Sequence, residues 1–170
     1  MIQFLKHREA ALGVIIAAMV AAIGAYAPAF VSLDNIIRVL NDTSILAMLA
    51  LAQMMVILTR GIDLSTASTL ALAGMISASL AQNHPELPVI AYIGLAIVTG
   101  IVLGFINGSL ISFLGIPPIV VTLGTLAVYR GMIVVYGGGN QVNASEMGDV
   151  FQSFPKLSVF GLSTLFWIMV

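Results

Sequence analysis

The chain has 170 residues, of which 60% are hydrophobic and 8% are charged, and its formal net charge is −1. Soluble domains carry about 25% charged residues, so this composition excludes an ordinary water-soluble domain, and without a Lys/Arg cluster a nucleic-acid partner is excluded as well. The chain has no Cys and only two isolated His residues, so no thiol chemistry, metal site or cofactor site is expected.

The first apolar run extends from Ala10 to Val31 without a charge. A spanning helix needs about 20 apolar residues, because the hydrocarbon core is about 30 Å thick and each residue rises about 1.5 Å. The run is longer than the apolar region of a signal peptide, which has about 7 to 15 residues, and Pro28 would directly follow a cut after Ala25-Tyr26-Ala27. We therefore predict an uncleaved transmembrane helix over residues 10–31.

Basic residues flank this first helix at Lys6 and Arg8. Cytoplasmic loops of membrane proteins carry an excess of Lys and Arg, so this cluster predicts a cytoplasmic N-terminus. The same orientation places Arg60 on the cytoplasmic side, and it places Arg38 and Lys156 outside.

Two shorter apolar runs follow, at residues 44–58 and 64–80. Fifteen residues of helix extend only about 22 Å. The second helix therefore either begins near residue 36, with Arg38, Asn41 and Asp42 at its outer end, or is a broken helix of the kind that lines transport paths. We predict helices over residues 36–58 and 64–80.

The start of the third helix carries residues that suit either structure or transport. Asp63 can accept backbone N–H bonds and complement the positive end of the helix, so a helix cap is its default role. Arg60 can pair with Asp63 or contact a cytoplasmic partner. The hydroxyl side chains that follow can line a wet path for a polyol, but in lipid they also bond back to their own helix. These hydroxyl residues are Ser65, Thr66, Ser68 and Thr69.

The fourth apolar run predicts a helix over residues 87–114, with small residues at a strict spacing of four on one face. Such a ridge lets another backbone approach closely. Packing against a neighbour in the same subunit is favoured over dimerisation of subunits. Asn107, near the end of this helix, suits a capping or interhelical hydrogen bond as well as a substrate contact. The ridge comprises Ala96, Gly100, Gly104 and Gly108.

The fifth predicted helix, over residues 119–136, contains Arg130. A charge at the bilayer centre costs about 2.5 to 3.5 kcal/mol on insertion scales, so something must compensate it. Eleven residues into the helix, Arg130 lies about 16 Å deep. Its guanidinium either forms a structural ion pair or serves transport, by hydrogen-bonding sugar hydroxyls or gating the path. The candidate ion-pair partners are Asp63, Asp42 and Glu146.

A polar loop from Gly137 to Lys156 is long enough to hold a small amphipathic element. Its run Gly137-Gly138-Gly139 lacks the Lys and Ser/Thr of a phosphate-binding loop, and no catalytic triad or paired carboxylates are suggested, so the chain is not expected to be an enzyme. The last apolar run, residues 157–170, gives only about 21 Å of helix, so we expect a chain truncated within its sixth helix. The predicted fold is all-α, a polytopic transmembrane helix bundle of about five to six helices in one domain over residues 1–170.

Four segments occur in a characteristic order: Thr59-Arg60-Gly61-Ile62-Asp63-Leu64-Ser65, Gly104-Phe105-Ile106-Asn107-Gly108, residues 115–126 (Gly-Ile-Pro-Pro-Ile-Val-Val-Thr-Leu-Gly-Thr-Leu) and Tyr129-Arg130-Gly131. Together they resemble the permeases of ribose-type ABC sugar importers. Within that family, residues 41–46, 84–88 and 141–144 are most similar to the branch that serves rhamnose, and the autoinducer-2 permeases come next. Residues 65–68 depart from the pattern, because the family usually has a Val-Gly pair between the two serines.

The resemblance implies a longer permease subunit in two related halves, of which this chain supplies the first. It further implies ABC ATPase subunits that hydrolyse ATP, a second permease subunit and a periplasmic sugar-binding protein, assembled in the bacterial inner membrane. The cargo implied is a monosaccharide, with rhamnose as the best match and autoinducer-2 or another pentose or hexose as the alternative. We place the substrate path at Arg130, Asp63, Ser65, Thr66 and Asn107.

Two other classes of protein fit less well. A self-sufficient secondary transporter would usually carry acids at membrane depth for ion or proton coupling, whereas most acids here lie in loops. A receptor or scaffold would need a sizeable soluble domain, whereas the longest polar loop is Gly137 to Lys156.

Overall fold

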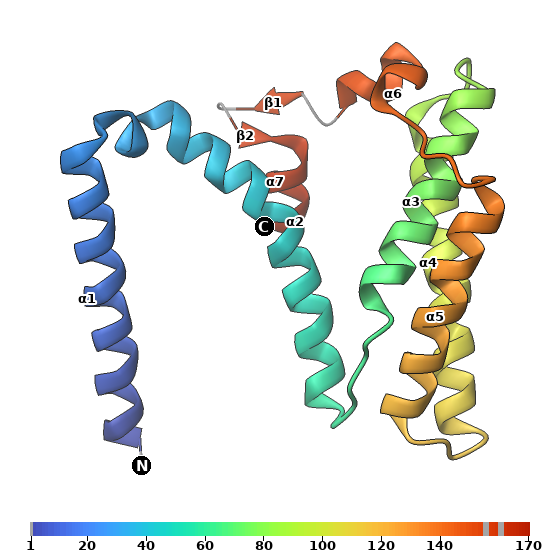
Figure 1. Ribbon diagram of the computed structural model, residues 1–170, viewed down its shortest axis with the longest axis horizontal. Helices are drawn as coiled ribbons and strands as arrows, with labels where there is room; N and C mark the ends of the chain where they lie inside the picture. The colour runs from blue at the N-terminus through green and yellow to red at the C-terminus, as the bar shows by residue number, and fades with distance from the viewer. Residues whose placement is uncertain (1, 155–156, 160–161) are drawn as a thin grey trace.

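A computed structural model describes residues 2–154, 157–159 and 162–170. Long helices dominate it (Figure 1). The helices are α1 (Ile2–Tyr26), α2 (Leu33–Leu58), α3 (Thr66–Asn83), α4 (Val89–Ser112), α5 (Pro118–Tyr136), α6 (Asp149–Ser153) and α7 (Thr164–Met169). The short elements are the 3-10 turns η1 (Pro28–Val31) and η2 (Ala144–Glu146) and the strands β1 (Ser158–Val159) and β2 (Leu162–Ser163).

Helices α3, α4 and α5 stand side by side as one unit (Figure 1). Leu72, Leu103 and Tyr129, one from each helix, form its buried core. At one end of the unit the Ser77 hydroxyl donates to the Tyr92 carbonyl (2.9 Å), and the Tyr92 hydroxyl donates to the His84 carbonyl (2.7 Å). Because buried polar groups cost free energy unless they are hydrogen-bonded, these bonds fix α3 against α4.

α2 is one continuous helix from Leu33 to Leu58, so the structure has the unbroken arrangement of the two that the sequence left open. It begins where the Ser32 side chain accepts a hydrogen bond from the Asn35 N–H (3.3 Å), with Asp34 in the first turn. Both features stabilise a helix N-terminus. The early start adds the length that residues 44–58 lack for a span.

Three of the described helices are long and apolar enough to cross a membrane, namely α2, α4 and α5. In α1, the part from Ala10 to Tyr26 is apolar but shorter. Although α3 has 18 residues, several of its buried positions are polar, among them Ser68 and Ser77. Since α3 packs against both α4 and α5, it presents less surface to lipid and needs less apolar character.

Of the helix predicted over residues 157–170, only Thr164–Met169 (α7) is helical in the described structure. The antiparallel pair β1 and β2, in register Ser158 with Ser163, precedes it. Ser163 explains the change, because its N–H donates to Asn41 on α2 (2.9 Å) and its hydroxyl accepts from the Phe166 N–H as a helix cap (3.4 Å). A capping serine marks a helix start and not a helix interior.

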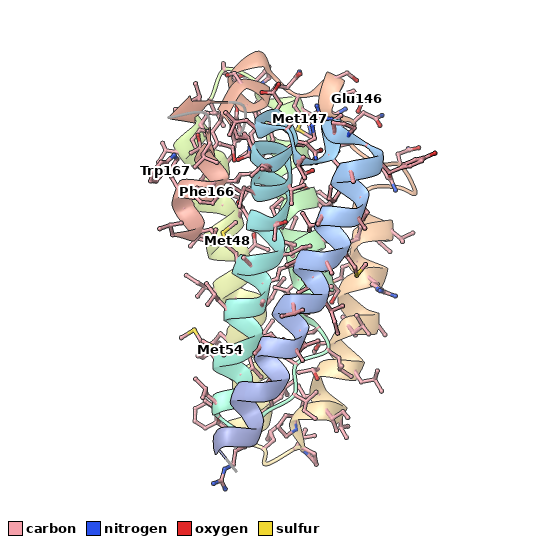
Figure 2. All side chains as sticks on the ribbon, turned by 90° about the vertical axis from the view of Figure 1, so that its left-hand side faces the viewer. Met48, Met54, Glu146, Met147, Phe166 and Trp167 are labelled. Atoms are coloured by element: carbon pink, nitrogen blue, oxygen red, sulfur yellow. The ribbon has the colours of Figure 1, made fainter. Side chains whose placement is uncertain are left out.

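The loop predicted after α5 does hold short helical elements, η2 and α6. It folds back over the α3–α4 turn, where a Cβ on Gly148 would come within 2.9 Å of the Pro85 Cβ. The Phe151 ring meets the Tyr92 ring edge-on, with centroids 5.4 Å apart. Figure 2 shows Glu146 and Met147 at one end of the molecule and Met54 toward the other.

Candidate functional site

The link between α2 and α3 is organised around Asp63. The Ser65 N–H and the Ser65 hydroxyl both donate to Asp63 Oδ1, each at 2.7 Å. Upstream, Arg60 takes the left-handed conformation (φ 59°), and the Gly61 N–H closes the end of α2 on the Val56 carbonyl (3.0 Å). Asp63 thus accepts a backbone N–H at the start of α3, as predicted, but this N–H belongs to the N-cap residue Ser65, so Asp63 forms a turn ahead of the helix and not a side-chain cap on its first turn.

A buried chain of hydrogen bonds continues from this link into α4 and α5. Asn107 Nδ2 donates to Ser65 Oγ (2.7 Å), and the Tyr129 hydroxyl donates to the Leu103 carbonyl (3.0 Å) with Asn107 Oδ1 at 3.4 Å. The exposed fractions are 0% for Ser65, 6% for Asn107 and 2% for Tyr129, so water does not compete for these groups. We call Asp63, Ser65, Asn107 and Tyr129 the polar chain.

The polar chain borders a cavity of about 570 Å³ between the α2–α3 link, α4 and α5. Asp63, Asn107 and Thr122 contribute its hydrogen-bonding groups, and Gly104 and Gly108 give it a wall of small residues. The Thr122 hydroxyl lies 2.8 Å from the Pro118 carbonyl and 3.1 Å from the Ile62 carbonyl. It therefore ties the start of α5 to the link that carries Asp63.

Asp63 and Asn107 both retain unused hydrogen-bonding capacity at this cavity. Within the described residues both hydrogen bonds to Asp63 reach Oδ1, so Oδ2 is available to accept. Asn107 Nδ2 carries two hydrogens, of which one is committed to Ser65. The site can thus donate hydrogen bonds to, and accept them from, a neutral ligand that carries hydroxyl groups.

Thr66 lies apart from the polar chain, although the sequence placed both on one path. Its hydroxyl donates to Gln53 on α2 (3.2 Å) and faces a second, more apolar cavity of about 400 Å³. Thr69, Ala96 and Gly100 also line that second cavity. Ser68, in contrast, bonds back to the Ser65 carbonyl (2.7 Å), which is the local alternative for these hydroxyl groups.

Arg130 is exposed on α5, six residues before its end at Tyr136. In the part of the chain that the structure describes, it forms no ion pair with the candidate partners Asp63, Asp42 or Glu146. The structural ion pair considered from the sequence is therefore not formed there. Six residues of helix correspond to about 9 Å, a distance that a long Arg side chain partly covers by extending along the helix toward its end. Arg60 likewise forms no ion pair with Asp63 in the described structure.

The small-residue ridge on α4 has no neighbouring element pressed against it. Among the described residues, no heavy atom beyond the helix's own nearby backbone and chain neighbours lies within 4 Å of the Cβ position at Gly100, Gly104 or Gly108. No described element therefore meets the ridge at these three glycines, and the favoured interpretation, packing against a neighbour in the same subunit, stays a prediction. Ala96 and Gly100 face the second cavity, and Gly104 and Gly108 face the first.

Sequence reasoning missed three residues whose side chains form hydrogen bonds at or near the candidate site: Gln53, Thr122 and Tyr129. Gln53 is a lone amide in the apolar run of α2, which is a signal in itself, because polar groups inside a span seek partners. Thr122 and Tyr129 lie on one face of α5 with Thr125, at spacings of three and four that also mark a buried helical stripe. Their partners, 60 and 26 residues distant along the chain, carry no local sequence signal.

Comparison with known proteins agrees with this architecture. Residues 35–170 match the family described as "Branched-chain amino acid transport system / permease component". The chain is 34% identical to the ribose import permease protein RbsC of Haemophilus influenzae over 98% of its own length and 51% of that protein. It is 34% identical to the autoinducer 2 import system permease protein LsrC of Salmonella typhi over 98% of the chain and 47% of that protein.

A third relative is the D-allose transport system permease protein AlsC of Escherichia coli K12, 35% identical over 87% of the chain and 45% of that protein. The chain thus spans about half the length of the curated relatives it matches. No solved structure matches it. Because the family match extends over most of the chain and the apolar helices are long enough to cross a bilayer, the chain is a multi-pass membrane protein that belongs to this family of transport-system permease components.

Proposed function

We propose that this chain forms part of the membrane-spanning permease subunit of an ATP-driven importer that moves a monosaccharide across the bacterial inner membrane. The observation that carries the proposal is the polar chain beside a cavity of about 570 Å³ between helices that are long and apolar enough to cross a membrane. Polar groups at depth in a membrane protein are costly and commonly mark a substrate path. The names of the three relatives, which are permeases for ribose, autoinducer 2 and D-allose, support a sugar-like cargo.

In this proposal the residues divide by role. Asp63 Oδ2 and the second Asn107 N–H contact cargo hydroxyls in the cavity, while Ser65, with its hydroxyl engaged on both sides, holds Asp63 and Asn107 in place. Thr66 remains a proposed path residue, although it faces the more apolar cavity and bonds to Gln53. Arg130 remains a proposed path residue near the far end of α5.

We propose the orientation of the chain in the membrane from the distribution of its basic residues. The N-terminus, the link 59–65 and the turn 113–117 lie at one end of the molecule, and the turn 84–88 and the loop after α5 lie at the other (Figure 1). The sequence positions of Lys6, Arg8 and Arg60 favour a cytoplasmic location for the first end. The proposed partners are ABC ATPase subunits and a second permease subunit, with a periplasmic sugar-binding protein that delivers cargo at the second end.

Rhamnose is the specific cargo that we propose, on the resemblance of residues 41–46, 84–88 and 141–144 to the rhamnose branch. The relatives named above favour ribose, autoinducer 2 and D-allose to the same degree. Competition for uptake of labelled L-rhamnose by unlabelled D-ribose, D-allose and autoinducer 2 ranks the four. Rhamnose should be the strongest competitor, and a stronger effect of another sugar would replace it as cargo.

The test of the transport mechanism is uptake of labelled sugar by cells that carry the complete importer. Depleting ATP should abolish uptake, whereas collapsing the ion gradients at constant ATP should leave it intact. The opposite pattern would contradict the proposal and make the chain part of an ion-coupled secondary transporter.

A further inference from the structure

A third cavity, which is polar, lies at the end of the α3–α5 unit opposite the polar chain. It has about 570 Å³ and is enclosed by the last turns of α3, the end of α5 and residues 140–146. Most of the side chains that line it carry amide, hydroxyl or carboxylate groups. Ligand pockets of about 300 to 1,000 Å³ are usually mostly apolar, so a cavity with this lining suits a ligand rich in hydrogen-bonding groups.

Glycines shape this cavity. Gly138 and Gly139 adopt positive φ (57° and 80°), and the Gly139 N–H donates to the Val134 carbonyl (3.0 Å), so the chain reverses directly after α5. A Cβ on Gly137 would stand 2.6 Å from both the Met75 Cε and the Asn140 carbonyl oxygen. The glycine run therefore serves to turn residues 140–146 back across the end of α3.

Glu146 holds the returning segment against α3. Its Oε2 accepts from Gln82 Nε2 (3.1 Å) and from the Asn143 N–H (3.2 Å), and its Oε1 accepts from Asn143 Nδ2 (3.0 Å). These charge-assisted bonds connect α3 to the loop and fix the position of Glu146. Figure 2 shows Glu146 at this end of the molecule.

Other lining groups stay available to a ligand. Within the described residues, the side chains of Asn140, Gln141 and Tyr136 form no hydrogen bond. Two amides supply both donors and acceptors, and a phenol ring supplies a flat apolar face. Among the described residues no Lys or Arg lines the cavity, which disfavours phosphorylated ligands, and the one carboxylate there is already committed to three donors.

We propose that this cavity is a binding site for a neutral polyhydroxyl molecule of monosaccharide size, separate from the polar chain. The role of this site in transport rests on the proposed function. In that role the site binds the sugar before the sugar reaches the cavity beside the polar chain. The chemistry itself is independent of that role, because vicinal hydroxyl groups both donate to and accept from side-chain amides. A surface that docks a protein, in contrast, would not need a concave cavity lined by neutral amides.

The test is sugar binding by the complete importer in lipid nanodiscs without nucleotide, followed by saturation-transfer NMR with L-rhamnose and, separately, D-ribose. Asn140→Ala combined with Gln141→Ala removes two ligand-facing amides and leaves the backbone bond from the Asn140 N–H to Gly137 in place. Loss of two hydrogen bonds should weaken binding at least about fivefold. The matched control is Ser145→Ala, since Ser145 is exposed on the same loop and outside the cavity lining.

The outcomes separate this inference from the proposed function. Weaker binding in the double variant, with wild-type binding in Ser145→Ala, supports the site. Equal binding in all three proteins overturns it, as does a double variant that binds sugar normally but loses the response of its ATPase to the sugar-binding protein. Absence of any ATP-dependent sugar uptake in the wild-type importer contradicts the proposed function, whereas normal wild-type uptake with unchanged binding in the variant contradicts the site alone.

Discussion

Asn107 on α4 donates its side-chain amide to the hydroxyl of Ser65, 42 residues earlier in the chain, at 2.7 Å. Both residues are buried, and Ser65 passes the interaction on to Asp63 at 2.7 Å. One amide thus couples the α2–α3 link to the interior of the α3–α5 unit. The interhelical hydrogen bond that the sequence allowed for Asn107 is therefore present.

Replacing Asn107 by Ala should destabilise the protein. The change leaves a buried acceptor on Ser65 unused and deprives Tyr129 of a neighbour, and losses of this kind cost about 1 to 3 kcal/mol. Thermal unfolding in detergent should show a lower midpoint for Asn107→Ala. The control Ser112→Ala, an exposed change on the same helix, should unfold like the wild type. Equal midpoints for Asn107→Ala and the wild type would remove the polar chain as a structural element.

Two substitutions at Asp63 separate hydrogen bonding from charge. Asp63→Ala removes the acceptor of two bonds and should cost about 1 kcal/mol, as loss of a capping side chain does. Asp63→Asn keeps an acceptor oxygen and should cost less. Hydrogen exchange at the Ser65 amide reports the difference, with Asp42→Asn as an exposed control. Faster exchange in Asp63→Asn than in Asp63→Ala would contradict the assigned role.

Thr122→Val removes a hydroxyl group without changing the shape of the side chain much. The Ile62 carbonyl then loses a partner that lies 3.1 Å away on another element, so we expect a loss of stability of about 1 kcal/mol and slower sugar uptake. Thr99→Val is the matched control, because in the described part of the chain the Thr99 hydroxyl bonds to the Leu95 carbonyl of its own helix (2.8 Å) and to no other element. An equal effect of the two substitutions on uptake would show that the contact to Ile62 does not matter.

Arg130→Ala should impair uptake in the full-length permease while leaving membrane insertion and stability intact. Stability should hold because no described carboxylate is paired with Arg130 and none is left unpaired by its removal. Uptake assays and quantification of the inserted protein together test the prediction. Normal uptake by Arg130→Ala would remove this residue from the substrate path.

Acid should loosen the loop that carries Glu146. The hydrogen bonds from the Asn143 side chain and backbone lower the pKa of the Glu146 carboxyl below its ordinary value. The stabilisation that these hydrogen bonds give is therefore complete above the pKa of Glu in the unfolded chain, about 4.3, and is lost as the pH falls through the lower pKa of the folded state. Hydrogen-exchange protection at Asn143 should fall below about pH 4.3 in the wild type. Protection at Asn143 in Glu146→Gln should not change with pH, and a wild type that behaves like this variant would contradict the assignment.

The helices were largely predictable because their signal is local. An apolar run of sufficient length between charged or Pro-containing breaks predicts a membrane helix, and α4 and α5 begin and end within two residues of the predicted limits. The bond that Asp63 accepts from a backbone N–H is local as well, since its partner Ser65 is two residues away.

The remaining features depend on contacts between distant segments. Ser163 caps a short helix through its hydroxyl, while its N–H donates to Asn41, 122 residues earlier, and no pattern within residues 157–170 reveals the bond to Asn41. The spacing of Gly100, Gly104 and Gly108 predicts a close approach but not whether a neighbour occupies it. Arg130 illustrates the same limit, because a partner in space cannot be chosen from three acids scattered along the sequence.

The central claim is that this chain belongs to an ATP-driven sugar importer, and co-purification tests it most directly. The full-length permease and the 170-residue chain would each be expressed with their neighbouring genes and isolated by a tag on this chain. We predict that the full-length form brings down an ATPase subunit whose ATP hydrolysis rises when rhamnose-loaded binding protein is added. Isolation of the full-length form without any ATPase, under conditions that preserve sugar uptake, would contradict the claim.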